Sequence, residues 1–176
     1  MKTYDRELEL GFEVSAAKAI KIITRENLVI LQQSIIHQTW LEEGEVGDYK
    51  FRTRIRRTEI SYPDVHGPFA GKCEFTTKYS KNDDEEAATQ DNMELNTEIT
   101  PEEYEKLKKI YEVAGKEEVV KIRTYFRTPL NTLSIYTLDT YPNEKGDRAR
   151  VEIEFKNKQE MEEWKAPDWF KELIAK

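Results

Sequence analysis

The chain alternates between polar and apolar residues in several short segments, and a period of two predicts β-strands. Residues 150–155 read Arg-Val-Glu-Ile-Glu-Phe, and residues 7–12 read Glu-Leu-Glu-Leu-Gly-Phe. Successive side chains of a strand point to opposite faces, so the two glutamates of each segment share one face at a spacing of roughly 7 Å. Like charges this close repel each other. The pattern therefore predicts that a divalent cation, or a set of Lys and Arg side chains, compensates them.

Alternation predicts further strands between these two segments. Residues 49–58 carry the strongest pattern, which places Arg52, Arg54 and Arg56 on one face. In the same way, Lys78 lies on the polar face of one later strand, and Lys121 and Arg123 share the polar face of another. The strand that contains Lys78 is predicted over 72–79, and the strand that contains Lys121 and Arg123 over 118–127. The remaining predicted strands are 31–41, 93–99 and 133–141.

Helix signals separate some of the strands. Ser15 is a good N-cap for a helix whose apolar residues follow at helical spacing. Residues 100–103 read Thr-Pro-Glu-Glu, a capping box with proline in the first turn, and Gly115 ends this helix. Two short helical pieces are expected within 158–173. The acidic segment 81–91 has no period and is predicted to be a loop.

About eight strands, joined by hairpins or a helix, favour an antiparallel meander that is large enough to close into a barrel. Two arrangements fit the alternation. In one, the apolar faces lie outside under helices and the charged faces line a lumen. In the other, an open sheet exposes its charged face to water. Segregation of charge favours the lumen, because solvated strands usually mix both signs, whereas here whole faces carry only Arg or only Glu.

The composition of the chain limits its class. A length of 176 residues favours one domain, 1–176. The net charge of −7 argues against a general binder of nucleic acid such as duplex DNA. Cys73 is the single cysteine, so no disulfide can form within the chain, and a reducing compartment follows. Because the sequence shows neither a signal peptide nor an apolar run that could span a membrane, we expect a soluble, cytoplasmic protein.

Taken in order along the chain, these motifs resemble one family. They are the Glu-x-Glu near the start, the Arg-x-Arg of 49–58, Lys78, the Lys-x-Arg at 121–123, Asp139, the Glu-x-Glu at 152–154 and a terminal Pro-Asp-Trp-Phe. Together they resemble the CYTH superfamily, also called triphosphate tunnel metalloenzymes. The resemblance implies an α+β fold, an eight-stranded antiparallel closed β-barrel (tunnel) with flanking helices. It also implies metal-dependent hydrolysis of a triphosphate.

The resemblance further assigns roles to individual residues. It implies that phosphate is bound by cationic side chains, and that one or two Mg²⁺ or Mn²⁺ ions are held by carboxylates. Arg forks and Lys charges neutralise a polyphosphate, while a metal ion bridges its oxygens. The implied phosphate-binding residues are Arg52, Arg54, Arg56, Lys78, Lys121 and Arg123. The implied metal ligands are Glu7, Glu9, Asp139, Glu152 and Glu154. Of these residues, Glu9, Lys121, Glu152 and Glu154 are expected to be catalytic.

The sequence also departs from the family pattern. Gly11 stands where the family's first strand carries a lysine, and Asn92 and Asn96 replace charged residues of another strand. Three functions are therefore compatible with the sequence. The first is a triphosphatase acting on inorganic triphosphate, a nucleotide or the 5′ end of RNA. The second is a protein that binds a nucleotide or polyphosphate without turnover, and the third is an adenylyl cyclase.

Overall fold

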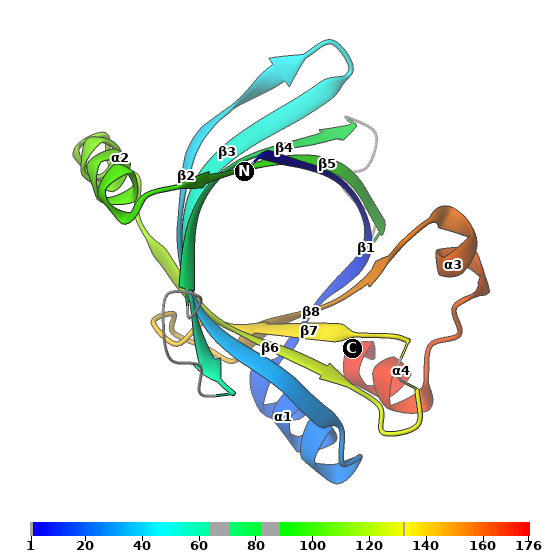
Figure 1. Ribbon diagram of the computed structural model, residues 1–176. Helices are drawn as coiled ribbons and strands as arrows, with labels where there is room; N and C mark the ends of the chain where they lie inside the picture. Colours follow the sequence, from blue (N-terminus) through cyan, green and yellow to red (C-terminus); the bar gives the residue numbers. More distant parts are fainter. Residues whose placement is uncertain (1, 64–70, 82–88, 132) are drawn as a thin grey trace.

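A computed structural model describes residues 2–63, 71–81, 89–131 and 133–176, without the side chains of 2–7 and 89–91. Its described part contains a curled antiparallel sheet with helices on its outer side (Figure 1). The strands are β1 (Lys2–Ser15), β2 (Val29–Val46), β3 (Tyr49–Tyr62), β4 (Gly71–Lys81), β5 (Thr89–Ile99), β6 (Val119–Arg127), β7 (Tyr136–Thr140) and β8 (Arg148–Phe155). The helices are α1 (Ala16–Arg25), α2 (Pro101–Val113), α3 (Lys158–Glu163) and α4 (Asp168–Ile174).

The strands follow the order β1-β5-β4-β3-β2-β6-β7-β8, and β8 returns to pair with β1. The wall of this ring has an uneven height. β2 is 18 residues long, whereas β7 has only five and pairs with each neighbour over five residues. The predicted eight-stranded antiparallel sheet with flanking helices is confirmed, and the ring order sets β3 across from β1 and β8 (Figure 1).

Several predicted strand boundaries are wrong. The strands expected over 31–41 and 49–58 extend further, to β2 (Val29–Val46) and β3 (Tyr49–Tyr62). The segment 81–91 was expected to be a loop, but β5 already begins at Thr89, because that residue pairs with Leu10 of β1. The strand expected over 133–141 is shorter, because a turn precedes it. In that turn the Asn131 amide donates to the Thr128 hydroxyl at 3.1 Å and the Leu133 amide donates to the Asn131 side chain at 2.9 Å.

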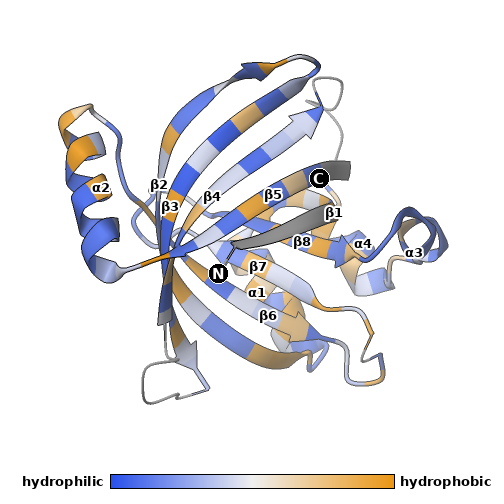
Figure 2. Ribbon diagram, turned by 45° about the horizontal axis from the view of Figure 1, so that its top comes forward, coloured by the Kyte–Doolittle hydropathy of each residue, from blue (hydrophilic) through white to orange (hydrophobic). Residues whose placement is uncertain are grey.

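The hydrophobic core lies outside the ring, between the strands and the helices. Val151 and Ile153 of β8 point outward and are fully buried under α1 and α4, while Phe170 of α4 is also fully buried. A smaller cluster forms where Tyr104 of α2 packs on Ile55 of β3. Hydrophilic and hydrophobic residues alternate along the strands (Figure 2), and many of the charged side chains face the inside of the ring.

The helix starts follow the predicted caps. The Ser15 hydroxyl accepts from the Lys18 amide at 3.0 Å, and Thr100 and Glu103 form the capping box of α2. Within the described residues, no helix combines the length and the apolar character needed to cross a membrane.

Candidate functional site

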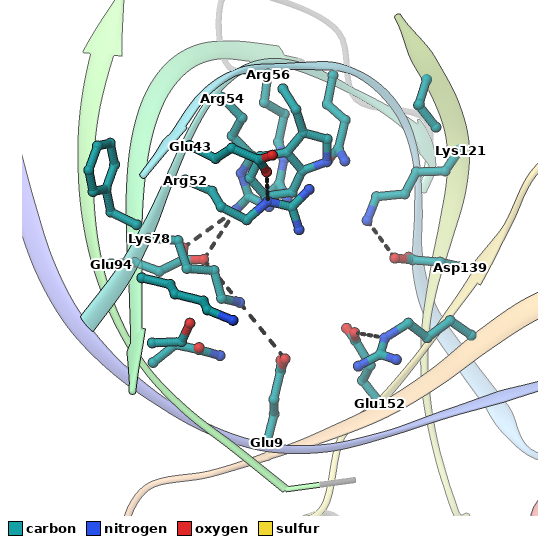
Figure 3. Close-up of a pocket in the computed structure, with 18 of the residues that line it drawn as sticks. Glu9, Glu43, Arg52, Arg54, Arg56, Lys78, Glu94, Lys121, Asp139 and Glu152 are labelled. Atoms are coloured by element: carbon teal, nitrogen blue, oxygen red, sulfur yellow. Dashed lines mark hydrogen bonds and ion pairs between the residues drawn. The ribbon is translucent and has the colours of Figure 1, made fainter. Parts of the chain in front are cut away.

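The inner face of the ring surrounds a cavity of about 890 Å³. Among the described residues that line it, ten are Lys or Arg and eight are Asp or Glu. The chain as a whole carries a net charge of −7, so positive charge is concentrated inside the ring. The arginines of β3 lie across the cavity from Glu9 and Glu152 (Figure 3).

Strand β3 provides the arginine wall. Its alternation sends Arg52, Arg54 and Arg56 inward, where Trp40 of the neighbouring β2 supports two of them. The guanidinium carbons of Arg52 and Arg54 lie 4.1 and 5.3 Å from the centre of the Trp40 ring. Arg54 also pairs with the buried Glu94 of β5 at 3.3 Å. Cation–π contact and ion pairing thus hold this wall in place.

Cations crowd each other deeper in the cavity. Burial and the neighbouring charges of Arg54 and Arg123 lower the pKa of Arg56 to about 10. Burial and the charge of Arg123 lower the pKa of Lys121 to about 8, although Asp139 opposes this shift. In both cases burial and nearby positive charge disfavour the charged form, and a polyanion in the cavity would favour it.

Asp139 of β7 holds two of these cations. Its carboxylate accepts from Lys121 Nζ at 2.6 Å and from Arg123 Nε at 2.7 Å, and its side chain is almost fully buried. Burial raises the pKa of Asp139, but the hydrogen bonds and charges of Arg123 and Lys121 outweigh it and lower this pKa to about 2. The pairing follows from register, because Asp139 lies directly opposite Arg123.

β1 and β8 together provide the carboxylate wall. Glu9 lies directly opposite Glu154 on the adjacent strand, and Glu152 lies opposite Gly11. Burial and the charges of Glu152 and Glu154 raise the pKa of Glu9, against the attraction of Lys78. Desolvation and the charge of Glu152 likewise raise the pKa of Glu154, against Arg123. Burial and mutual repulsion therefore disfavour the charged forms of Glu9 and Glu154 more than the nearby cations favour them.

Glu152 behaves differently from the other two glutamates. Burial raises its pKa, but Arg123 and Arg150 lower it more strongly. Arg150 Nε donates to Glu152 at 2.6 Å, and Arg123 lies 3.2 Å from the same carboxylate. Glu152 therefore connects the carboxylate wall to the cation cluster that Lys121 and Arg123 form around Asp139.

The donor chemistry of the carboxylate wall fits a hard divalent cation. Glu9 and Glu154 offer oxygen ligands with raised pKa values, and a cation between them would relieve their repulsion. Asp139 fits less well, because Lys121 and Arg123 already neutralise it. Among the described side chains, no three Asp, Glu, His or Cys residues are grouped as metal ligands. A metal ion at this wall would therefore draw first on Glu9 and Glu154, since Glu152 is held by Arg150 and Arg123.

The cavity brings together nearly all the residues singled out in the sequence. Lining it are Glu9, Arg52, Arg54, Arg56, Lys78, Lys121, Arg123, Asp139, Glu152 and Glu154. The side chain of Glu7 lies outside the described residues. The segregated faces expected from the sequence do share one cavity, while the roles of individual residues in binding phosphate or metal stay predictions.

Three residues outside the predicted phosphate and metal ligands also line this site. Glu94 is buried and lies 3.4 Å from Lys78 as well as close to Arg54, so it balances two cations. Trp40 supports the arginine wall, and Arg150 reaches Glu152. Alternation along each strand predicts that all three side chains face inward. Their partners lie on other strands, so the contacts themselves depend on the register between strands.

Comparisons with known proteins identify the fold. No family model matches the sequence, and no curated protein sequence matches it. Among solved structures, the PH1819 protein of Pyrococcus horikoshii is 20% identical, with a TM-score of 0.53 over 88% of this chain and 82% of that one. A Hippeastrum protein, described as an adenylyl cyclase candidate with a dominant triphosphatase activity, is 13% identical, with a TM-score of 0.57 over 89% and 82%.

These neighbours have CYTH-type tunnel folds, so the resemblance seen in the sequence is confirmed for the fold. The same fold also resembles a chain of the Mediator head module of Schizosaccharomyces pombe. That chain is 10% identical, with a TM-score of 0.53 over 90% of this chain and 88% of that one. Because one architecture occurs in such different settings, function has to be argued from the site.

Proposed function

We propose that this protein is a divalent-metal-dependent triphosphatase that hydrolyses a triphosphate inside the ring. The observation that supports this most strongly is that Arg56 and Lys121 are buried in the cavity wall beside other cations, so that burial and neighbouring positive charge lower both pKa values. Such an arrangement is unfavourable for the protein alone and favourable when a polyanion binds. The separate carboxylate wall adds the second component that hydrolysis of a triphosphate needs.

The arginine wall and the cation cluster would bind the phosphate chain. Arg54, Arg56 and Arg123 offer planar forks that match phosphate oxygens, and Lys78 and Lys121 add point charges. Asp139 is a positioning residue in this scheme, because its hydrogen bonds aim Lys121 and Arg123 at the cavity. Arg54 and Lys121 are buried, and their charge interactions with a phosphate would be stronger than in bulk water, because the effective dielectric constant is lower there.

Mg²⁺ or Mn²⁺ would be held by Glu9, Glu152 and Glu154, with Glu7 adjacent to them in the sequence. When bound, the ion would neutralise phosphate oxygens and acidify a water molecule for in-line attack. Lys121, with a pKa of about 8, carries a proton at neutral pH and is suited to donate it to the leaving phosphate oxygen. No covalent intermediate is required.

One experiment separates the proposal from its alternatives. Purified protein is incubated with tripolyphosphate, ATP or 5′-triphosphorylated RNA and with Mg²⁺ or Mn²⁺. Released phosphate supports hydrolysis, cyclic AMP indicates a cyclase, and tight binding of unchanged ligand indicates a binding protein. The product profile across the three substrates also identifies the preferred one.

A double variant tests the carboxylate wall. Glu152→Gln with Glu154→Gln should lower turnover roughly 100-fold or more, since transition-state stabilisation by a metal ion is worth several kcal/mol. The matched control is Glu102→Gln with Glu112→Gln, which removes two exposed charges from α2, outside the cavity. Full turnover in the Glu152 and Glu154 variant would refute the metal site.

A further inference from the structure

Position 11 is the next inward-facing position of β1 after Glu9, and it carries no side chain. Gly11 is not among the glycines with a positive φ, which are Gly47, Gly115 and Gly146. Its strand conformation therefore suits any residue. A glycine within a strand that does not need its flexibility usually marks the close approach of another group.

The group that approaches Gly11 is the guanidinium of Arg150. A Cβ atom placed on Gly11 would lie 2.1 Å from Arg150 Nη2 and 2.7 Å from its Cζ. Real Cβ atoms do not approach other atoms this closely, so a side chain at position 11 and the observed Arg150 conformation exclude each other. Arg150 starts from β8 opposite Glu13 and reaches along β1 to fill this space.

Arg150 is held at this place but keeps donors for a ligand. Its Nε donates to Glu152 at 2.6 Å, and its Nη1 lies 3.8 Å from Glu13. Arginine has five N–H donors in a planar fork, and the hydrogen bond to Glu152 uses only the one on Nε. Arg150 also lines the cavity, and its side chain is 22% exposed.

We infer that Arg150, seated over Gly11, is a phosphate-binding residue of this tunnel, supplying from β8 the cation that β1 lacks at position 11. This inference rests on the proposed function. Arg150 would place a planar fork at the carboxylate wall, across from the arginines of β3, so that a phosphate chain meets cations on both sides. Gly11 permits this arrangement, because the absence of a side chain at position 11 leaves room for the guanidinium of Arg150.

The ordinary alternative is that Arg150 only pairs with Glu152. Both readings predict some loss of stability when Arg150 is removed. They differ in phosphate affinity and in the coupling between positions 11 and 150. The experiment therefore measures binding of tripolyphosphate by calorimetry without metal, alongside melting temperature and hydrolysis with Mg²⁺ or Mn²⁺.

Arg150→Ala should weaken tripolyphosphate binding roughly 10- to 100-fold, the value of one charge-assisted contact. Arg150→Lys should lose less, because it keeps the charge without the fork. Gly11→Ala should also weaken binding, since the new Cβ displaces the guanidinium. In the Arg150→Ala background, Gly11→Ala should have no further effect, whereas Gly11→Lys should restore most of the lost affinity. The control is Arg25→Ala, which removes an arginine that pairs with Glu172 on the outer surface.

The outcomes separate this inference from the proposed function. Unchanged tripolyphosphate affinity in Arg150→Ala, or independent effects of Gly11→Ala and Arg150→Ala, overturns the inference even if the protein hydrolyses triphosphates. Weakened and coupled binding in a protein that hydrolyses nothing supports the inference and refutes the triphosphatase. A wild-type protein that binds no tripolyphosphate refutes both.

Discussion

Single carboxylates in this ring have opposite effects on stability. Asp139 has a pKa lowered to about 2 because Arg123 and Lys121 hold its charged form. Glu9 has a raised pKa, because burial and neighbouring glutamates disfavour its charge. The first residue therefore stabilises the free protein at neutral pH, and the second destabilises it. Alternation in the sequence predicted that both side chains face the lumen, but it did not indicate that their pKa values shift in opposite directions.

Asp139→Asn should lower the free energy of unfolding by roughly 3–5 kcal/mol at pH 7, because it removes the carboxylate that pairs with the buried Lys121 and leaves Arg123 with Glu152 alone. The contribution of Asp139 is present above its ordinary pKa of 3.8 and is lost as pH falls from about 4 to about 2. Urea denaturation at pH 7 and near pH 2 measures both effects. Equal stability of variant and wild type at pH 7 would contradict the pairing.

Glu9→Gln should raise the melting temperature of the free protein at pH 7, on the order of a few degrees. A carboxyl whose pKa is raised on folding favours the folded state below its ordinary pKa of 4.5 and loses that contribution as pH rises. The gain should therefore disappear near pH 4. Hydrolysis should be lost at the same time, as expected where a site stores repulsion for function. Glu13→Gln, at an exposed position of the same strand, should give no gain.

Lys121 gives the proposed binding site a pH dependence. With a pKa of about 8 in the free protein, Lys121 loses its positive charge as pH rises through 8, and tripolyphosphate affinity should fall above that value. Lys121→Arg keeps the charge at higher pH, so the variant should lack this fall. The ratio of the two dissociation constants at each pH cancels the titration of the ligand itself. A constant ratio between pH 7 and 9.5 would argue against contact between Lys121 and phosphate.

At the scale of elements, the sequence predicted which segments form strands and which residues cap the starts of helices α1 and α2. Two of the boundaries that it missed are explained by a partner strand and by a local turn. Thr89 joins β5 because β1 extends to pair with it, and Asn131 shortens β7 by closing a turn. Register explains the missed ion pairs in the same way. The pairing of Arg123 with Asp139 depends on how β6 aligns with β7, which alternation within one strand does not specify.

Helix α4 is expected to stabilise the part of the ring that contains the short strand β7. Phe170 is fully buried and packs within 6 Å of the rings of Phe12, Tyr136, Trp164 and Trp169. Phe170→Ala should lower the free energy of unfolding by about 3–5 kcal/mol, through lost transfer energy and the cavity left behind. Leu133→Ala, at a residue that is 86% exposed, should change it by less than about 0.5 kcal/mol. Equal effects of both variants in urea denaturation would contradict this role of α4.

At the scale of the molecule, charge is divided between inside and outside. The chain carries a net charge of −7, yet the described residues that line the cavity include more Lys and Arg than Asp and Glu. Composition alone indicated an acidic protein with no general affinity for nucleic acid. The segregation of Arg and Glu onto separate strand faces favoured a charged lumen over a solvated sheet, and the pairing of β8 with β1 brings those faces to one cavity.

This division predicts selection for a free triphosphate end. The negative exterior repels a long duplex, while the interior attracts a short polyanion that enters the ring. Duplex DNA should therefore displace bound tripolyphosphate at least roughly 100-fold less well than unlabelled tripolyphosphate does. A short RNA with a 5′-triphosphate should compete, and the same RNA with a 5′-hydroxyl should not. Fluorescence competition at constant ionic strength measures all four. If duplex DNA or hydroxyl-ended RNA competed as well as the triphosphorylated RNA, binding would be a property of the outer surface and the enclosed site would lose its role.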